Sequence, residues 1–321
     1  MSSLSLRRDR NRILTMLTLA AAIFAAFTVA PAAAGTDSHG ASALWCDEPT
    51  VFDSLDSFAV SSTARGAAVI VREKELGQVH KNVPANRSRA SRPGFSATVP
   101  TWVHVVSDGE IGNVSDRAIN EQIRVLDMTF GGFEGGVATG FNFELAGVTR
   151  TDNATWHYAD DFESESAMKQ ALKRGGDNTL NLYVTTAGAY LGWAYYPSIT
   201  DNPTYAYLDG VVIDWESMRG TSTTYAGRYD QGETGTHEVG HWLNLAHTFE
   251  GKCGSQGDFV ADTPSERTPT SGCPIGKDTC PAPGLDPIHN YMDYSFDSCY
   301  TEFTAGQAAR MHDAWLFWRA S

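Results

Sequence analysis

Positive charge is scarce in this chain of 321 residues. It has 24 lysine and arginine residues against 38 aspartate and glutamate residues, and its formal net charge is −14 at pH 7. A nucleic acid partner requires a basic surface that neutralises phosphates, so the composition argues against one. The acidic excess favours solubility and the binding of divalent cations. No internal repeat and no low-complexity linker divides the chain.

Long apolar runs are absent after residue 30, so no later segment is predicted to span a membrane. Before it, an apolar stretch (residues 13–30) follows a basic region and leads to the small residues 32–34; the basic residues are Arg7, Arg8, Arg10 and Arg12. A membrane anchor is the alternative, but the alanines and the A-x-A ending favour a cleaved signal peptide over residues 1–34. We therefore expect a secreted protein without membrane contact. Its net charge is −17, because cleavage removes four arginines and one aspartate.

Cysteine is also rare, and four of the five cysteines crowd the last quarter of the chain: Cys253, Cys273, Cys280 and Cys299. In an exported protein, an even cluster of this kind predicts two disulfides. Four cysteines allow three pairings, and their spacing does not choose among them. A structural zinc site at these cysteines is disfavoured because CxxC pairs are absent.

Three of the nine histidines occur at the spacing of a hydrolytic metal site. On a helix over residues 237–243, His237 and His241 are four residues apart and project from one face, where they can share an ion. Glu238 then lies about 100° round the helix axis, on the open side of the ion. The pattern predicts zinc, since neutral imidazole is a preferred zinc ligand.

The third ligand, His247, cannot come from a continued helix, because six residues would rotate it roughly 240° from His241. The helix must end and the chain must turn back. Asn244 stands at the required position, and asparagine tolerates the left-handed conformation that ends helices. Three ligands leave a fourth position for water, as in catalytic zinc sites.

The chemistry that fits this pattern is hydrolysis by a zinc-activated water, with Glu238 as the general base. No serine nucleophile motif of the G-x-S-x-G type competes for the role. Other interpretations are an amphipathic helix with surface histidines, an exported zinc-binding or adhesive module without turnover, and a zinc amidase acting on a small or cell-wall peptide. Retention of Glu238 argues against a module without turnover, because a structural zinc needs no base beside it.

Several further motifs resemble the pappalysin family of metzincin zinc metallopeptidases, in particular its ulilysin-like secreted members. They are His247-Thr248-Phe249, Gly257 to Pro264, Asn290-Tyr291-Met292-Asp293-Tyr294 and Phe303 to Gln307. The resemblance is strong over residues 234–312 and weaker back to about residue 100. It implies an α/β (α+β) metzincin-like protease domain. This is a twisted, mostly parallel sheet with an active-site helix, a Met-turn and a C-terminal helix. The family usually has glycine where this chain has Asn244.

The resemblance also implies roles for individual residues. Met292 would pack beneath the metal ligands, and the Tyr294 hydroxyl would stabilise the oxyanion of the tetrahedral intermediate. The implied disulfides are Cys253–Cys280 and Cys273–Cys299. A calcium ion is implied near the cleft, and its candidate ligands are the oxygens of Asp258, Asp262 and Thr263. Asp293 or Asp297 would favour arginine or lysine after the scissile bond.

Residues 35–92 have little periodicity and end in a basic stretch (residues 86–92), which predicts a pro-segment with a protease-sensitive junction. Cys46 lies within it, and its thiolate could occupy the fourth zinc position and keep the enzyme latent. An incidental or intermolecularly paired thiol is the alternative. The catalytic domain is then 93–321, acting on proteins or peptides, and a monomer is favoured.

Within this domain the pattern predicts alternating strands and helices. Strands are expected at 101–106, 141–148, 180–184 and 211–213. Helices are expected after a Ser115 cap through residue 130, at 163–174 with a stop at Gly175-Gly176, and from a Thr304–Gln307 capping box through Trp318.

Overall fold

The computed structural model describes residues 92–158, 161–188 and 190–320. The predicted signal peptide, nearly all of the predicted pro-segment and Cys46 lie outside the described residues. Among the residues that are described, no helix is both long and apolar enough to cross a membrane.

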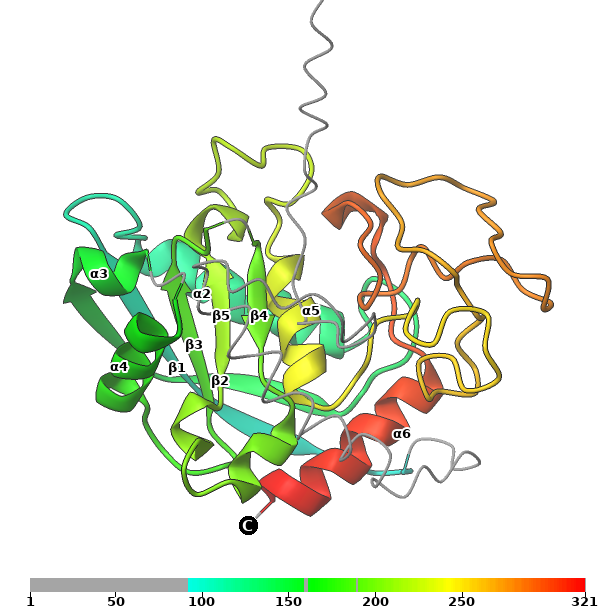
Figure 1. The fold of residues 1–321 in the computed structure, drawn as a ribbon, viewed down its shortest axis with the longest axis horizontal. Helices are drawn as coiled ribbons and strands as arrows, with labels where there is room; N and C mark the ends of the chain where they lie inside the picture. The colour runs from blue at the N-terminus through cyan, green and yellow to red at the C-terminus, as the bar shows by residue number, and fades with distance from the viewer. Residues whose placement is uncertain (1–91, 159–160, 189, 321) are drawn as a thin grey trace, which may run out of the picture. The chain divides into compact units, whose positions relative to one another are not determined.

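One five-stranded sheet forms the centre of the described chain, in the order β2-β1-β3-β5-β4 (Figure 1). Its strands are β1 (Ala97–Ser107), β2 (Phe141–Asp152), β3 (Leu180–Thr185), β4 (Gly192–Ala194) and β5 (Val211–Asp214). β1, β2, β3 and β5 are parallel, and β4 runs antiparallel to β5 at the edge. The predicted mostly parallel sheet is confirmed, whereas the short strand β4 was not predicted.

Side chains alternate between two apolar layers, one on each face of the sheet. Leu182 of β3 and Ile213 of β5 pack in the larger core together with residues of the helices α2 (Asp116–Phe130), α5 (Glu233–Trp242) and α6 (Ala305–Ala314). Tyr183 and Val212, one position away, pack in the smaller core against Met168 of the helix α4 (Phe162–Leu172). Because both faces are covered, every residue of β3 and β5 is buried, and these strands are apolar in the sequence except at Asn181, Thr185 and Asp214.

The helices are α2 (Asp116–Phe130), α3 (Ala154–His157), α4 (Phe162–Leu172), α5 (Glu233–Trp242) and α6 (Ala305–Ala314). One-turn 3-10 helices occupy Pro197–Asp201, Ala206–Leu208, Trp215–Ser217 and Asp297–Cys299. Ser115 caps α2, and Thr304 and Gln307 form a capping box at α6, both as predicted. After α6 a π-helical turn (Trp315–Arg319) continues the helical path through Trp318.

The predicted end of α4 is wrong by two residues. The helix ends at Leu172, before the glycine pair, and Lys173 leaves the helical conformation with φ −52° and ψ 136°. Asn181 of β3 explains this, because its side chain accepts a hydrogen bond from the Arg174 amide (2.7 Å) and donates one to the Arg174 carbonyl (2.9 Å). A contact between residues seven positions apart therefore overrides the glycine stop signal.

The segment from residue 243 to residue 304 has little regular structure. It contains one 3-10 turn (Asp297–Cys299) and an isolated bridge between Asn290 and Glu302. Two disulfides cross-link it, Cys253–Cys280 and Cys273–Cys299, each with 5.5 Å between Cα atoms. Both implied pairings are confirmed. A long irregular segment gains much from such links, which restrict the unfolded chain.

Candidate active site

The three histidines of the motif converge at the end of α5. The Nε2 atom of His241 lies 3.0 Å from that of His237 and 3.1 Å from that of His247. All three side chains are buried, and their ring nitrogens form one of two groups with metal-ligating potential among the described residues. Tetrahedral zinc with bonds of roughly 2.0–2.1 Å would separate two donors by about 3.3 Å. The spacing of the nitrogens therefore suits zinc.

The hydrogen bonds of the other ring nitrogens support this assignment. Nδ1 of His237 is 2.7 Å from the carbonyl oxygen of Tyr291, and Nδ1 of His241 is 2.7 Å from that of Leu245. A carbonyl only accepts, so each Nδ1 carries the proton and each Nε2 presents a lone pair. Two lone pairs at 3.0 Å repel unless they share a cation. The arrangement thus fits a metal ion.

Burial keeps the rings of His237 and His247 neutral. It lowers the pKa of His237 to about 4 and that of His247 well below its usual value, and the neighbouring rings lower the latter further. A neutral imidazole is the form that ligates a metal, so the protein holds the ligands in their binding state at neutral pH.

The turn that brings His247 into place has the geometry predicted from Asn244. Its φ is +77°, in the left-handed region. The Asn244 amide donates to the His241 carbonyl (2.8 Å) and the Leu245 amide to the Gly240 carbonyl (2.9 Å), which together form a Schellman motif. The same turn supplies the Leu245 carbonyl that orients His241, so it places two ligands at once.

Glu238 is buried beside the histidines and faces the edge strand β4. A Cβ atom at Gly192 of β4 would lie 3.0 Å from Cγ and 3.2 Å from Oε1 of Glu238. The nearest atom to such a Cβ atom would be the Val212 carbonyl oxygen of β5, at 2.6 Å, so glycine at position 192 permits the pairing with β5 and also leaves room for the glutamate. Gly192 could not be recognised from the sequence, because a three-residue strand gives no periodic signal.

Met292 lies under the active-site helix, as expected. It is fully buried, and a Cβ atom at Gly240 would approach its sulfur to 2.4 Å, so the absence of a side chain at position 240 admits the thioether. The turn is fixed on both sides: the Met292 amide donates to Asn290 Oδ1 (3.0 Å), and the Met292 carbonyl accepts from the Thr248 amide (3.1 Å).

Tyr294 follows Met292 by two residues, and its ring contacts the rings of two ligands. Its ring centroid lies 5.7 Å from that of His237 and 4.9 Å from that of His247. Phe249 stacks on His247 at 4.7 Å and also contacts Tyr294. Tyr294 and Phe249 therefore pack against the rings of two ligands, His237 and His247.

The structure does not bring the three candidate calcium ligands together. Asp262 accepts hydrogen bonds from the Thr304 hydroxyl (2.8 Å) and the Gly306 amide (2.9 Å), so it stabilises the start of α6. Asp258 is buried, which raises its pKa to about 7; its carboxylate accepts a hydrogen bond from the Val260 amide (3.0 Å), and Thr263 lies beside it. Neither aspartate belongs to a group of three metal-ligating side chains within the described chain.

Asp293 and Asp297, the candidates for a basic specificity pocket, are both buried. Asp293 accepts from the amides of Thr270 (2.9 Å) and Tyr294 (2.7 Å). Asp297 accepts from the Gln231 amide (2.8 Å) and shares a hydrogen bond with the carboxyl of Glu233. Glu233, at the start of α5, is a second residue of the site that no sequence motif indicated.

The second group with metal-ligating potential is Cys273, His289 and Cys299. Both of its sulfurs are joined in a disulfide, so they are not available as thiolate ligands.

Comparisons with known proteins agree with this geometry. A peptidase family model (M43), described as pregnancy-associated plasma protein-A, matches residues 180–315. An extracellular metalloprotease of Pyricularia oryzae is 46% identical over 242 residues, which are 74% of this chain and 81% of that protein. One of Verticillium alfalfae is 47% identical over 230 residues, 69% of this chain and 77% of that protein.

Two solved structures are similar in fold and in sequence. Mature mirolysin of Tannerella forsythia, in complex with a cleaved peptide, has a TM-score of 0.58 and 31% identity, covering 68% of this chain and 92% of that chain. A promirolysin mutant of the same organism has a TM-score of 0.62 and 29% identity, covering 78% of this chain and 88% of that chain.

Proposed function

Because this chain belongs to the pappalysin family (M43) of metzincin metallopeptidases, we propose that it uses zinc held by His237, His241 and His247 and takes Glu238 as general base. The predicted family, the predicted fold and the predicted metalloendopeptidase activity are confirmed. The zinc ion, the ligand set and the roles of single residues belong to the proposal.

The observation that supports zinc most directly is the approach of three ring nitrogens, two of which present lone pairs 3.0 Å apart. When bound there, zinc polarises the scissile carbonyl and lowers the pKa of water towards neutrality. The protein itself orients the ligands. The carbonyls of Tyr291 and Leu245 orient two of the rings, and the Asn244 turn places the third.

Glu238 is positioned to move protons. As general base it accepts a proton from the attacking water and then donates it to the leaving amine, so no covalent acyl-enzyme forms. The Tyr294 hydroxyl is proposed to donate a hydrogen bond to the oxyanion, and replacement of Tyr294 by phenylalanine should then lower kcat about 10²-fold with little change in KM. A kcat equal to that of the parent would rule this role out.

Replacement of Glu238 by alanine tests the mechanism. The variant should fold and bind one zinc ion per chain but lose casein cleavage by about 10²–10⁴-fold. Replacement of the exposed Glu110 by alanine is the control for loss of a carboxylate, and it should leave cleavage unchanged. Cleavage at the parental rate in the Glu238 variant would remove the mechanism.

We propose further that the protein is secreted as a zymogen, with a signal peptide over 1–34, a pro-segment over 35–92 and a catalytic domain over 93–321. The extracellular relatives and the match to promirolysin support this. Proteins or peptides are the substrates, and a monomer is favoured. If Cys46 keeps the zymogen latent, replacement by alanine should shorten the lag before self-processing. Equal lags in the two precursors would exclude a Cys46 switch.

A calcium ion bound by Asp258 and Thr263 remains part of the proposal, in a reduced form without the side chain of Asp262. A buried carboxylate next to a hydroxyl offers hard oxygen ligands. Calcium should then raise the melting temperature of the parent after treatment with EGTA but not that of an Asp258→Asn variant. Equal responses of the two proteins would exclude this site.

A further inference from the structure

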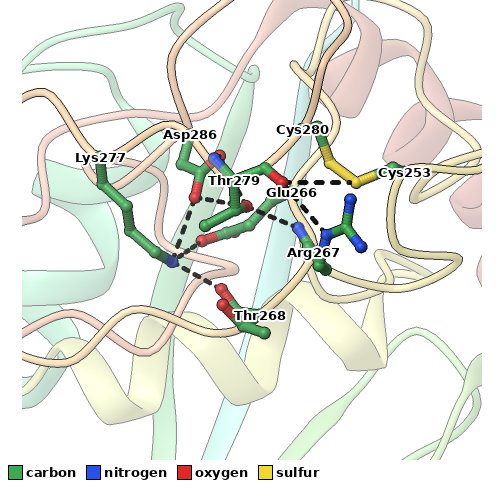
Figure 2. Close-up of a disulfide and its surroundings, with 8 residues drawn as sticks. All are labelled: Cys253, Glu266, Arg267, Thr268, Lys277, Thr279, Cys280 and Asp286. Carbon is green, nitrogen blue, oxygen red and sulfur yellow. Dashed lines mark hydrogen bonds and ion pairs between the residues drawn. A yellow bond between two sulfur atoms is a disulfide. The ribbon is translucent and has the colours of Figure 1, made fainter.

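A buried network of charges holds the disulfide-linked segment together, and a lysine lies at its centre. The Lys277 ammonium donates to Glu266 Oε1, to the Thr268 carbonyl and to the Thr270 hydroxyl (2.9 Å), and it lies 3.3 Å from Asp286 Oδ2. Figure 2 shows it between Glu266, Thr268 and Asp286. The side chains of Glu266 and Asp286 are fully buried, and only 15% of the Lys277 side chain is exposed.

The four oxygen atoms around this ammonium are those that a hard cation takes as ligands. They comprise two carboxylate oxygens, one carbonyl oxygen and one hydroxyl oxygen. Two buried carboxylates require a compensating positive charge, since an unpaired buried charge is strongly destabilising. Here the chain supplies that charge itself. Burial raises the pKa of Glu266 to about 7, and Lys277 opposes this rise.

The network reaches the third metal ligand through one residue. Glu266 Oε2 accepts a hydrogen bond from the hydroxyl of Thr248 (2.7 Å), which directly follows His247, and Oε1 accepts from Thr270 (3.0 Å). The Thr270 amide donates to Asp293, which directly follows Met292. Glu266 and Thr270 therefore hold both the segment that carries His247 and the Met-turn.

The opposite side of the network is joined to a disulfide. The Thr279 hydroxyl and amide lie within 3.0 Å of the Asp286 carboxylate, and the next residue, Cys280, is bound to Cys253 (Figure 2). The Asp286 carboxylate is thus fixed independently of the Lys277 side chain. The lysine connects this fixed carboxylate to the buried path Glu266–Thr248–His247.

We propose that the Lys277 ammonium, lying between Glu266 and Asp286, neutralises these carboxylates as a bound cation would. We propose also that through Glu266 and Thr248 it positions His247 for metal binding. Lys277 and Glu266 are positioning residues in this scheme. The second part of the proposal depends on the proposed role of His247 as a zinc ligand, whereas the first part does not.

Replacement of Lys277 by alanine tests the first part. The variant should melt roughly 6–15 °C below the parent, because it leaves two buried carboxylates without a counter-charge. Calcium should restore at least half of this loss by entering the vacated space. A Lys277→Met variant should show the loss without the recovery, since its side chain fills that space. The exposed Lys252 of the same segment provides the control, and its replacement by methionine should leave the melting temperature unchanged.

A Lys277→Ala variant as stable as the parent would overturn the proposal. The proposal would also be overturned if calcium raised the melting temperature of the Lys277→Ala variant no more than that of the parent. Melting curves involve no peptide cleavage, so these outcomes do not depend on the catalytic role of Glu238.

Zinc affinity tests the second part. In competition with a chelator, and without calcium, the Lys277→Ala variant should bind zinc about 10-fold more weakly than the parent. The milder Glu266→Gln variant, which keeps one of the two acceptor oxygens that bond to Thr248 and Thr270, serves if the alanine variant does not fold, and it should weaken zinc binding less. Parental zinc affinity in a folded variant would refute the positioning role.

Discussion

At the scale of single residues, the site depends on two glycines that make room for functional side chains. Gly192 leaves space for Glu238, and Gly240 leaves space for Met292. A helix interior ordinarily disfavours glycine relative to alanine by roughly 0.5–1 kcal/mol. Its presence at position 240 therefore indicates that access for the Met292 sulfur outweighs the loss of helix propensity.

A Gly240→Ala variant should consequently be less stable than the parent. Overpacking against the Met292 sulfur costs roughly 1–3 kcal/mol, more than the helix gains from alanine. Urea denaturation of the single variants and of the Gly240→Ala/Met292→Ala double variant would measure this. In the background without the Met292 side chain, the alanine at position 240 should be neutral or stabilising. A loss of the same size in both backgrounds would contradict the packing explanation.

At the scale of secondary structure elements, the end of α5 determines where His247 lies. Asn244 adopts a conformation that costs other L-residues roughly 1–2 kcal/mol. The Arg310 guanidinium of α6 donates to the Asn244 carbonyl (2.6 Å), which fixes the turn from the opposite side. The helix end is therefore set by local conformation together with a contact over 66 residues.

Two substitutions at position 244 should have opposite effects. Glycine should be tolerated without loss of stability, because it adopts positive φ freely. Alanine should destabilise the protein by about 1 kcal/mol and weaken zinc binding, since the turn carries both His247 and the carbonyl that orients His241. Urea denaturation and chelator competition would measure these effects. Alanine and glycine variants that behave alike would show that the left-handed conformation is not limiting.

Much of the site could be predicted from sequence because its residues are close together in the chain. The ligands, Glu238 and Asn244 lie within eleven residues, and the periodicity of a helix relates them directly. β4 was missed because three residues are too few for a period. The pairs Lys277–Glu266 and Glu233–Asp297 were missed because nothing local links their members. The spacing of the cysteines left three pairings open, and only the family resemblance selected the correct one.

At the scale of the whole molecule, buried carboxyls make stability depend on pH. Glu233 and Asp297 share a hydrogen bond in the interior. Burial is the main cause of both pKa shifts: it raises the pKa of Glu233 to about 7, and it raises that of Asp297 well above its usual value, with the neighbouring carboxyl adding to the rise. Glu134, Asp230 and Arg219 are the other charged groups that influence the pair. The pair therefore favours the folded state only while one of its carboxyls is protonated.

The sign of this effect follows from proton binding. Between pH 4.5, the usual pKa of glutamate, and about 7, folded Glu233 binds more protons than the unfolded chain does. The stabilisation is complete below this window and is lost as the pH rises through about 7. The melting temperature of the metal-free protein should therefore fall more steeply with rising pH across this window for the parent than for a Glu233→Gln variant. Parallel curves would show that the pair does not hold a proton.

The two cross-links between residues 253 and 299 restrict where this enzyme can be made in working form. The last ligand and the Met-turn lie on or beside a stretch of some fifty residues that has almost no helix or strand of its own to hold it. Synthesis in a reducing cytosol would leave that stretch without its covalent supports, however well the sheet had assembled. Peptidase activity would accordingly require an oxidising compartment, which would protect the producing cell in addition to the proposed pro-segment.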